Sequence, residues 1–345
     1  MRGLINIIMT KIDLITGFLG SGKTTFIRYY VKYLTGIGEK VCILENDYGA
    51  INIDTMLLAD LKSDNCDIEM VAGGCDYDCH RRRFKTKLIT MAMLGFTRVI
   101  VEPSGIYDVD EFFDILNESP VDSMYCISNV ITIINPYANF GNINDLFHKN
   151  DLFLQDDFGE ADYLLASQAA MAGCIVLSHI TDSQHDKLIN LCNYINNSLE
   201  MIKCHRTFHA ENIIAVNWDN LSDSDFEKIV NAGYQTVSFE KAFSMDENGF
   251  ESLFFMHIHM DKEILLSKIN ELFHDKEVGN VVRVKGFLMT DEAENKWIEI
   301  NATNLGIHLN SINNGQEVLI VIGENLKREK IDSYFNSKYS SCRLE

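Results

Sequence analysis

The sequence predicts an α/β protein with a doubly wound, mostly parallel sheet and a second, smaller α+β domain behind it. Three observations lead to this fold class: a glycine-rich motif between a strand and a helix, short apolar runs that alternate with helical patterns, and strands in succession near the C-terminus. We expect residues 1–232 to form the first domain, residues 233–250 a linker and residues 251–345 the second domain.

In the first domain, short apolar runs are typical of strands buried in a parallel sheet. The helix after the first run is expected over residues 25–34, where apolar residues recur at helical spacing, and Gly36 and Gly38 end it. The runs that predict strands are 12–16, 41–44, 98–102, 130–134, 174–177 and 213–216.

The pattern changes after about residue 235, because strands then follow one another instead of alternating with helices. Helices are expected over residues 261–273 and 326–335. The predicted strands of this second domain are 254–260, 281–289, 297–303 and 318–323.

Composition excludes several classes of partner. The formal net charge of −20 repels nucleic-acid phosphates and anionic lipids, so we expect neither nucleic acid nor membrane as a partner. Nine irregularly spaced cysteines do not form a disulfide framework, and no apolar stretch reaches the roughly 20 residues of a membrane span. These features are typical of a cytoplasmic protein with reduced thiols.

Residues 17–24 satisfy the pattern G-x-x-x-x-G-K-[ST] in full, with the strand before it and the helix after it that a phosphate-binding loop requires. Its backbone N–H groups and the positive end of the helix would hold the phosphates of a nucleoside triphosphate. Lys23 would act catalytically on the β- and γ-phosphates, and the Thr24 hydroxyl would bind Mg²⁺. The expected phosphate-binding residues are Gly17, Gly20, Ser21, Gly22, Lys23, Thr24 and Thr25.

Acidic residues follow two of the predicted strands. Glu102 ends an apolar run and is expected to contact Mg²⁺ from the second shell or to orient water, while the Gly105 N–H would sense the γ-phosphate. Asp47 and Asp54 lie after the second strand, at the ligand-binding edge of such sheets, and are candidates for catalysis and metal binding. A solvated acidic turn is the alternative for Asp47 and Asp54.

Cys75 and Cys79 form a C-x₃-C pair, with His80 beside it. Two sulfurs at this spacing can bind one cation, and thiolate favours Zn²⁺, Cu⁺ or Fe over Mg²⁺. Two thiols supply only half of a tetrahedral ligand set, so an ordinary pair of reduced thiols is the alternative. His257 and His259 are expected to be a surface or interface pair. Arg81–Arg83 are expected to form a solvated helix face, and compensation of the acidic loop or contact with a client protein are the alternatives.

The order of these elements resembles the CobW-type P-loop GTPases, a family of metallochaperones and cobalamin-related proteins akin to the urease and hydrogenase nickel-insertion GTPases. The matching segments are residues 16–25, 46–49 with 53–54, 73–75, 102–105, 284–288 and 319–323. The resemblance implies GTP/GDP binding with Mg²⁺, slow GTP hydrolysis, and handling of Zn²⁺ or another transition metal, or of a cofactor that contains one.

Two departures from the family pattern are visible. The tight Cys-x-Cys-Cys after the paired glycines is reduced to Cys75 and a displaced Cys79. The guanine-reading Asn-Lys-x-Asp is replaced by Ser178-His179-Ile180-Thr181, with Asp182 one residue late. Ser178, His179 and Asp182 are therefore the candidate base contacts, GTP is expected from the resemblance, and ATP stays open.

Together these features predict a nucleotide-switched metallochaperone whose client is a metalloprotein or a corrinoid enzyme. Hydrolysis is expected to be slow without a partner, because no arginine is placed as a finger in the same chain. A nucleotide-sensing scaffold with little hydrolysis is the alternative, and a small-molecule kinase ranks third.

Overall fold

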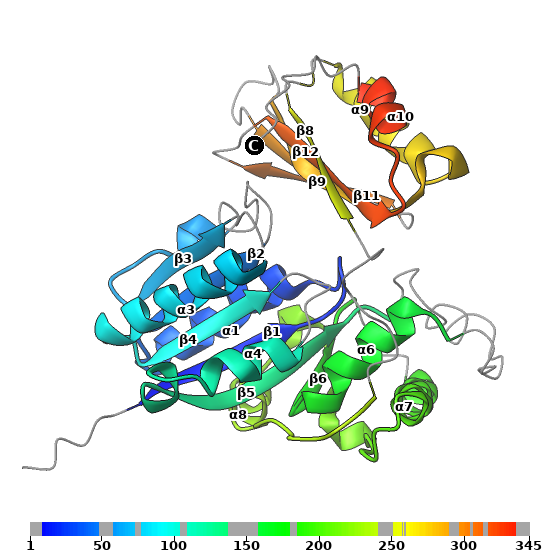
Figure 1. Cartoon of the computed structure of the whole chain (residues 1–345). Helices are drawn as coiled ribbons and strands as arrows, with labels where there is room; N and C mark the ends of the chain where they lie inside the picture. Colours follow the sequence, from blue (N-terminus) through cyan, green and yellow to red (C-terminus); the bar gives the residue numbers. More distant parts are fainter. Residues whose placement is uncertain are drawn as a thin grey trace, which may run out of the picture. The chain divides into compact units, whose positions relative to one another are not determined.

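The computed structural model describes residues 9–47, 58–72, 77–103, 109–136, 158–179, 185–240, 251–256, 258, 260–289, 297–303, 306–312 and 317–335. The chain divides into two compact units, Met1–Phe243 and Ser244–Glu345, each described here by itself (Figure 1). The linker predicted at 233–250 stays a prediction, since residues 241–250 lie outside the described ranges.

The first unit alternates strands and helices along the chain, as the apolar runs predicted. Its elements are β1 Thr10–Thr16, α1 Lys23–Gly36, β2 Val41–Asp47, η1 Ala59–Leu61, β3 Cys66–Ala72, α3 Tyr77–Met93, β4 Arg98–Pro103, α4 Val109–Leu116, η2 Val121–Ser123, β5 Tyr125–Ile134, α6 Glu160–Met171, β6 Cys174–Leu177, α7 His185–Met201, η4 Ala210–Asn212, β7 Ile213–Ile214, η5 Trp218–Asn220 and α8 Asp223–Val230.

The strands of this unit form one seven-stranded sheet in the order β3-β2-β4-β1-β5-β6-β7, and every neighbouring pair is parallel. Helices cover both faces, with α1 and α8 on one side and α3, α4, α6 and α7 on the other (Figure 1). The predicted doubly wound parallel sheet is confirmed. Because the strands are parallel, their carboxyl ends meet at one edge, where ligands bind in such sheets.

The second unit is an antiparallel sheet with helices on one face. Its strands lie in the order β11-β10-β9-β12-β8, and α9 and α10 pack on it around Ile300, Val321 and Phe335. This confirms the predicted smaller α+β domain. The elements are β8 Glu251–Met256, α9 Lys262–Leu272, η6 Lys276–Val278, β9 Asn280–Met289, β10 Trp297–Thr303, β11 Gly306–Ile312, β12 Val318–Glu324 and α10 Arg328–Phe335.

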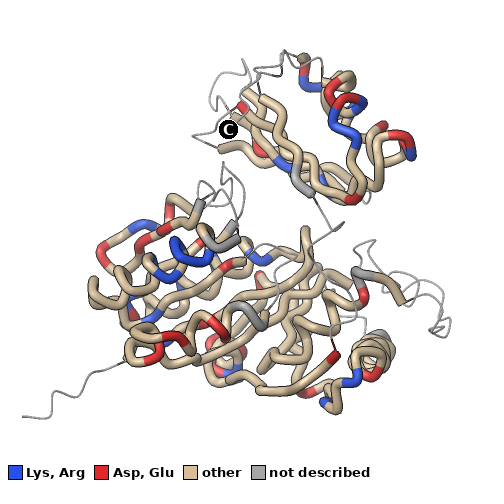
Figure 2. The backbone as a smooth tube through the Cα atoms, viewed as in Figure 1, with Lys and Arg blue, Asp and Glu red and all other residues tan. Residues whose placement is uncertain are grey.

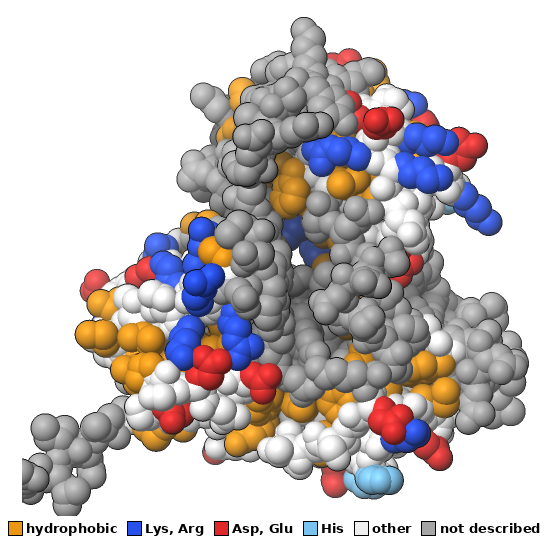
Figure 3. Space-filling model, in the orientation of Figure 1, with side chains coloured by type: hydrophobic (Ala, Val, Ile, Leu, Met, Phe, Trp, Pro, Cys, Tyr) orange, Lys and Arg blue, Asp and Glu red, His pale blue; other side chains and the backbone are white. Residues whose placement is uncertain are grey.

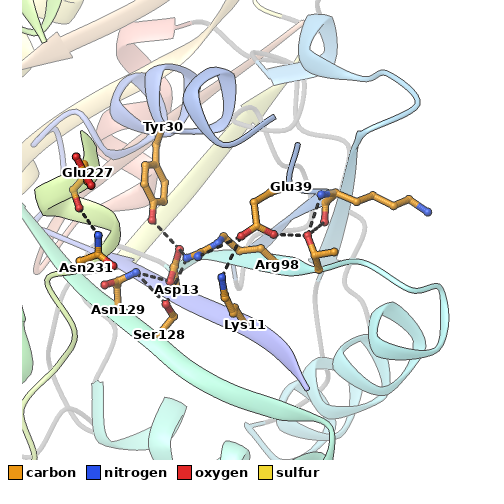
Figure 4. Close-up of polar contacts among 11 residues, drawn as sticks. Lys11, Asp13, Tyr30, Glu39, Arg98, Ser128, Asn129, Glu227 and Asn231 are labelled. Atoms are coloured by element: carbon orange, nitrogen blue, oxygen red, sulfur yellow. Dashed lines mark hydrogen bonds and ion pairs between the residues drawn. The ribbon is translucent and has the colours of Figure 1, made fainter. Parts of the chain in front are cut away.

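A buried polar network lies inside the first unit, away from the edge where the strands end (Figure 4). The carboxylate of Asp13 on β1 accepts from the Arg98 guanidinium at 2.6 Å, from the Tyr30 hydroxyl at 2.8 Å and from the Asn129 amide at 2.9 Å. Asp13 and Arg98 are 0% and 1% exposed. Burial and then the Asp13 charge raise the pKa of Tyr30 well above its usual value. The network joins β1, β4, β5 and α1.

None of the described helices is long and apolar enough to cross a membrane.

Replacing Asp13 with asparagine removes the nearer carboxylate from the buried Arg98 guanidinium, at 2.6 Å, and leaves Glu39 at 3.5 Å. Since breaking a buried ion pair is expensive, we expect Asp13→Asn to lower the free energy of unfolding by about 3 kcal/mol. Urea denaturation measures this change. Asp60→Asn, which breaks the exposed Arg28–Asp60 pair, serves as control and should cost less than about 1 kcal/mol. Equal effects of the two substitutions would contradict the role given to Asp13.

Candidate nucleotide and metal site

The loop between β1 and α1 has a backbone that only glycine adopts without strain. Gly17, Gly20 and Gly22 have φ angles of +142°, +77° and +99°. A Cβ atom on Gly17 would lie 2.3 Å from the carbonyl oxygen of Ile133 on β5, so the loop leaves no room for a side chain there. With the N-terminus of α1 directly behind it, this curled backbone fits a phosphate group.

The polar side chains of the loop and of the first turn of α1 differ in their exposure. The ammonium of Lys23 lies back over the loop and donates to the Gly17 carbonyl at 2.8 Å, and its side chain is buried. Ser21 is fully buried, and its hydroxyl has no hydrogen-bond partner among the described residues. Thr25 is exposed in the first turn of α1. Phosphate oxygens would give Lys23 and the loop N–H groups the acceptors that these groups suit.

Thr24 joins this loop to the next strand of the site. Its hydroxyl donates to Oε1 of Glu102 at 2.8 Å, at the carboxyl end of β4. Glu45 on β2 is the register partner of Glu102, and the two carboxylates are only 2% and 5% exposed, respectively. Two buried carboxylates on adjacent strands next to a hydroxyl form a set of hard oxygen atoms, which fits Mg²⁺ and which a cation would stabilise.

Glu45 was missed by the sequence analysis, which placed the acidic role on Asp47 two residues later. The signal was present: Glu45 directly follows the apolar run 41–44, and a carboxylate at such a place is rarely buried without a partner or a ligand. Asp47 ends β2, but its side chain lies outside the described part.

The expected base contacts divide into described and undescribed residues. The Ser178 N–H donates to the Ile134 carbonyl at 2.9 Å and its hydroxyl lies 3.4 Å from the same oxygen, while His179 has a φ of +56°. These contacts tie Ser178, directly after β6, to the end of β5. Asp182, the candidate for reading the base, lies outside the described residues, as does Thr181.

Trp218 is a contact that the sequence analysis did not find. Its indole N–H donates to the Leu177 carbonyl at the end of β6 at 2.8 Å. Its ring lies against the phosphate loop, where a Cβ on Gly22 would be 2.9 Å from it, and it packs on Phe26 and Tyr29. Trp218 therefore connects the end of β6 to the phosphate loop. The segment that follows β6, residues 178–182, holds the expected base contacts and is called the base loop below.

Of the two predicted thiol ligands, only Cys79 is described. It lies half-buried in the first turn of α3, and Cys75 lies outside the described ranges. His80, the next residue, is 3% exposed and its Nε2 is 2.7 Å from Oδ1 of Asn46 on β2. Within the described ranges, no three histidine, cysteine or acidic side chains converge as a metal site.

Most of the remaining described thiols are buried, which fits structural roles. Cys42, Cys66 and Cys174 are buried, and burial raises the pKa of Cys66 to about 11 and that of Cys174 to about 12. A thiol that resists deprotonation is a poor metal ligand. Cys126 is exposed on β5. Asp54, Gly105, His257 and His259 lie outside the described residues, so the roles expected for them stay predictions.

The three arginines after Cys79 lie on α3, in a basic stretch that Figures 2 and 3 show on one face of the first unit. Arg81 and Lys85 both pair with Glu118, at 2.5 Å and 2.7 Å, and Lys87 pairs with Glu69 at 2.5 Å. Arg82 and Arg83 are exposed. The paired side chains of Arg81, Lys85 and Lys87 therefore hold α3 against its neighbours, whereas the exposure of Arg82 and Arg83 fits the expected solvated helix face.

Comparison with known sequence families and proteins gives matches in both units. The profile described as "CobW/HypB/UreG, nucleotide-binding domain" matches residues 11–209, and that of the "Cobalamin synthesis protein cobW C-terminal domain" matches residues 255–338. The zinc chaperone YeiR of Escherichia coli is 28% identical over 162 residues, which cover 47% of this chain and 47% of YeiR. The zinc chaperone YjiA of the same organism is 24% identical over 172 residues, covering 47% of this chain and 50% of YjiA.

The chain thus spans about half the length of the curated relatives it matches. Among solved structures, that of the Zn(II)-bound YjiA GTPase from E. coli aligns over 95% of this chain and 98% of YjiA, with 15% identity and a TM-score of 0.35.

Gly17→Ala tests the phosphate loop directly. The new methyl group would collide with the Ile133 carbonyl oxygen, and alanine strains at a φ of +142°. We expect nucleotide affinity to fall at least about tenfold, since the curled backbone carries the anion contacts. Titration with a fluorescent guanine nucleotide measures the loss. Gly36→Ala, at the open end of α1, is the matched control and should keep full affinity and gain up to about 1 kcal/mol of stability. Unchanged affinity in Gly17→Ala would contradict the site.

Proposed function

Because the chain belongs to the CobW/HypB/UreG family of nucleotide-binding proteins, we propose that it is a nucleotide-switched metallochaperone that hydrolyses GTP slowly. The observation that carries this proposal is the Thr24–Glu102 hydrogen bond, which joins the phosphate loop to the strand ends beside the cysteine-bearing helix. Two relatives of about half-length coverage are named zinc chaperones, which favours Zn²⁺ as the transported metal. The free cysteines are in keeping with action in the cytoplasm.

In this proposal the chain's own residues perform the nucleotide chemistry. Lys23 leaves the Gly17 carbonyl and donates to the β- and γ-phosphates, while the loop N–H groups hold the same oxygens. Thr24, Glu102 and Glu45 are the residues that would hold Mg²⁺, directly or through water. Bound there, Mg²⁺ would neutralise charge that develops on the phosphate oxygens. Glu102 also orients the Thr24 hydroxyl, so the strand end and the loop move together.

Asp47, Asp54 and Gly105 are proposed to respond to the γ-phosphate at the same sheet edge. Cys75 and Cys79 follow β3, which pairs with β2, and are proposed to bind the transition metal. Release to a client metalloprotein or corrinoid enzyme would follow hydrolysis, when the strand ends lose their phosphate contacts. Trp218, Ser178 and His179 support the base loop, and Asp182 is proposed to read the base.

The choice of GTP over ATP follows from family membership and has its own test. Competition of unlabelled GDP and ADP against a fluorescent GDP should favour GDP at least about tenfold, a difference of about 1.4 kcal/mol. The rejection of adenine depends on one anionic partner for the guanine N–H groups, so Asp182→Asn should reduce this preference. Asp64→Asn, at an exposed carboxylate before β3, is the control. Equal affinities for GDP and ADP in the unmodified protein would remove the GTP assignment.

Metal binding is tested by titrating reduced protein with Zn²⁺ and Co²⁺, once with Mg²⁺ and a non-hydrolysable GTP analogue and once with Mg²⁺ and GDP. We expect stoichiometric binding that changes at least about tenfold between the nucleotide states. The Cys75→Ala, Cys79→Ala variant should lose it, because thiolate supplies the soft ligands. Cys126→Ala removes an exposed thiol elsewhere and should bind as the unmodified protein does.

Weak binding that ignores both the nucleotide and the two cysteines would contradict the metallochaperone proposal. A nucleotide-sensing scaffold for a client enzyme would then be the function left by the phosphate loop.

A further inference from the structure

The hydrogen bond between His80 and Asn46 connects two parts of the site that the proposed function must couple. His80 is the residue after Cys79 in the first turn of α3, and Asn46 precedes Asp47 at the end of β2. The two residues are 34 positions apart, yet His80 Nε2 lies 2.7 Å from Asn46 Oδ1. Because an amide oxygen only accepts, the Nε2–H of His80 is the donor.

Both partners are almost completely buried, with exposed fractions of 3% for His80 and 2% for Asn46. Hydrogen bonds shielded from water are electrostatically stronger than those in water and are expensive to leave unmade. A displacement of the end of β2 is therefore transmitted to the first turn of α3, or else breaks this bond. Transmission of the displacement moves Cys79, the residue next to the donor, whereas loss of the bond releases the first turn of α3 from the end of β2.

The end of β2 is in turn connected to the phosphate loop. Asn46 is the neighbour of Glu45 along the strand, and Glu45 is in register with Glu102, which accepts from Thr24. A continuous series of contacts thus leads from Thr24 through the ends of β4 and β2 to His80 and Cys79. Such a series of contacts is a physical route for coupling. It couples the two sites only if nucleotide binding and metal binding both shift the position of the end of β2.

We propose that His80 is a positioning residue that couples the nucleotide state to the metal affinity of Cys79 by donating to Asn46. This inference rests on the proposed metallochaperone function and adds the contact through which the switch acts. The role assigns no metal ligation to the Nε2 atom of His80, since Asn46 occupies it.

A bond that transmits the nucleotide state and a bond that only stabilises the fold have different effects on metal affinity. If the bond only stabilised the fold, its loss would weaken metal binding equally in both nucleotide states. If it transmits the nucleotide state, its loss reduces the ratio between the two metal affinities while each site still binds its own ligand.

The experiment measures Co²⁺ affinity, from the thiolate absorption of the complex, with Mg²⁺ and either a GTP analogue or GDP. In the unmodified protein we expect a ratio of at least about ten between the two states. His80→Phe keeps an aromatic ring without the donor, and its ratio should fall to within about twofold of one. His80→Gln places an amide donor near the position of Nε2 and should restore most of the ratio. His205→Phe, at an exposed histidine, should leave it unchanged.

Asn46→Ala removes the acceptor instead of the donor and keeps the test decisive if His80→Phe does not fold. It should lose the same coupling, and the double variant should lose no more than either single change, as partners in one interaction do. A ratio retained in Asn46→Ala or in a folded His80→Phe overturns the inference and leaves the proposed function standing. A ratio near one in the unmodified protein overturns both.

Discussion

The parallel alignment of β1, β2 and β4 is the constraint on which the whole site depends. These strands end at one edge of the sheet, so Glu45 and Glu102 come into register there, and Thr24, directly after the loop that follows β1, reaches Glu102. The close approach of Gly17 to the Ile133 carbonyl fixes that loop against β5. Away from this edge, the buried Asp13–Arg98 pair joins β1 to β4 and opposes any slip between them. The pair thereby helps to fix the register between β1 and β4 that the phosphate site requires.

Because of this alignment, the hard oxygen ligands and the soft thiol ligands lie on different elements. Thr24 and Glu102 bring oxygen atoms together at the phosphate loop, and Glu45 lies in register with Glu102 on the adjacent strand. The described thiol of the cysteine pair lies instead on α3, which packs against β3. Mg²⁺ and a thiophilic metal would therefore occupy separate places and meet only through the protein. In the account proposed here, the end of β2 is the element that both places share, and His80 is its contact with the thiol-bearing helix.

Much of the fold was predictable because its signals are local. The phosphate loop was identified from one motif with its flanking strand and helix, and β6 was predicted at its observed bounds from four apolar residues. β3 escaped because polar Asp67 and Glu69 alternate with apolar residues, as suits an edge strand with neighbours on one side only. β11 was not predicted, because most of its residues are exposed and it lacks an apolar run. β7 is shorter than predicted, since only two residues pair with β6.

The candidate site was predictable only in part for the same reason. Glu102 could be chosen from its place after an apolar run, but the partnership of Glu45 with it depends on strand order, which no local pattern contains. The contacts of His80 with Asn46 and of Trp218 with Leu177 join residues far apart in the chain. Side chains that look unremarkable in sequence become informative once the topology places their partners.

The central claim is that nucleotide and metal binding are coupled through the chain, and the most direct test is the reverse of a metal titration. The affinity for a fluorescent GTP analogue and for fluorescent GDP would be measured with and without stoichiometric Zn²⁺, all with Mg²⁺. Coupling between two binding sites is reciprocal, so the account predicts that Zn²⁺ changes the ratio of the two nucleotide affinities by the factor found in the metal titration, at least about tenfold. A ratio that Zn²⁺ does not change, in protein that binds Zn²⁺ stoichiometrically, would contradict the claim.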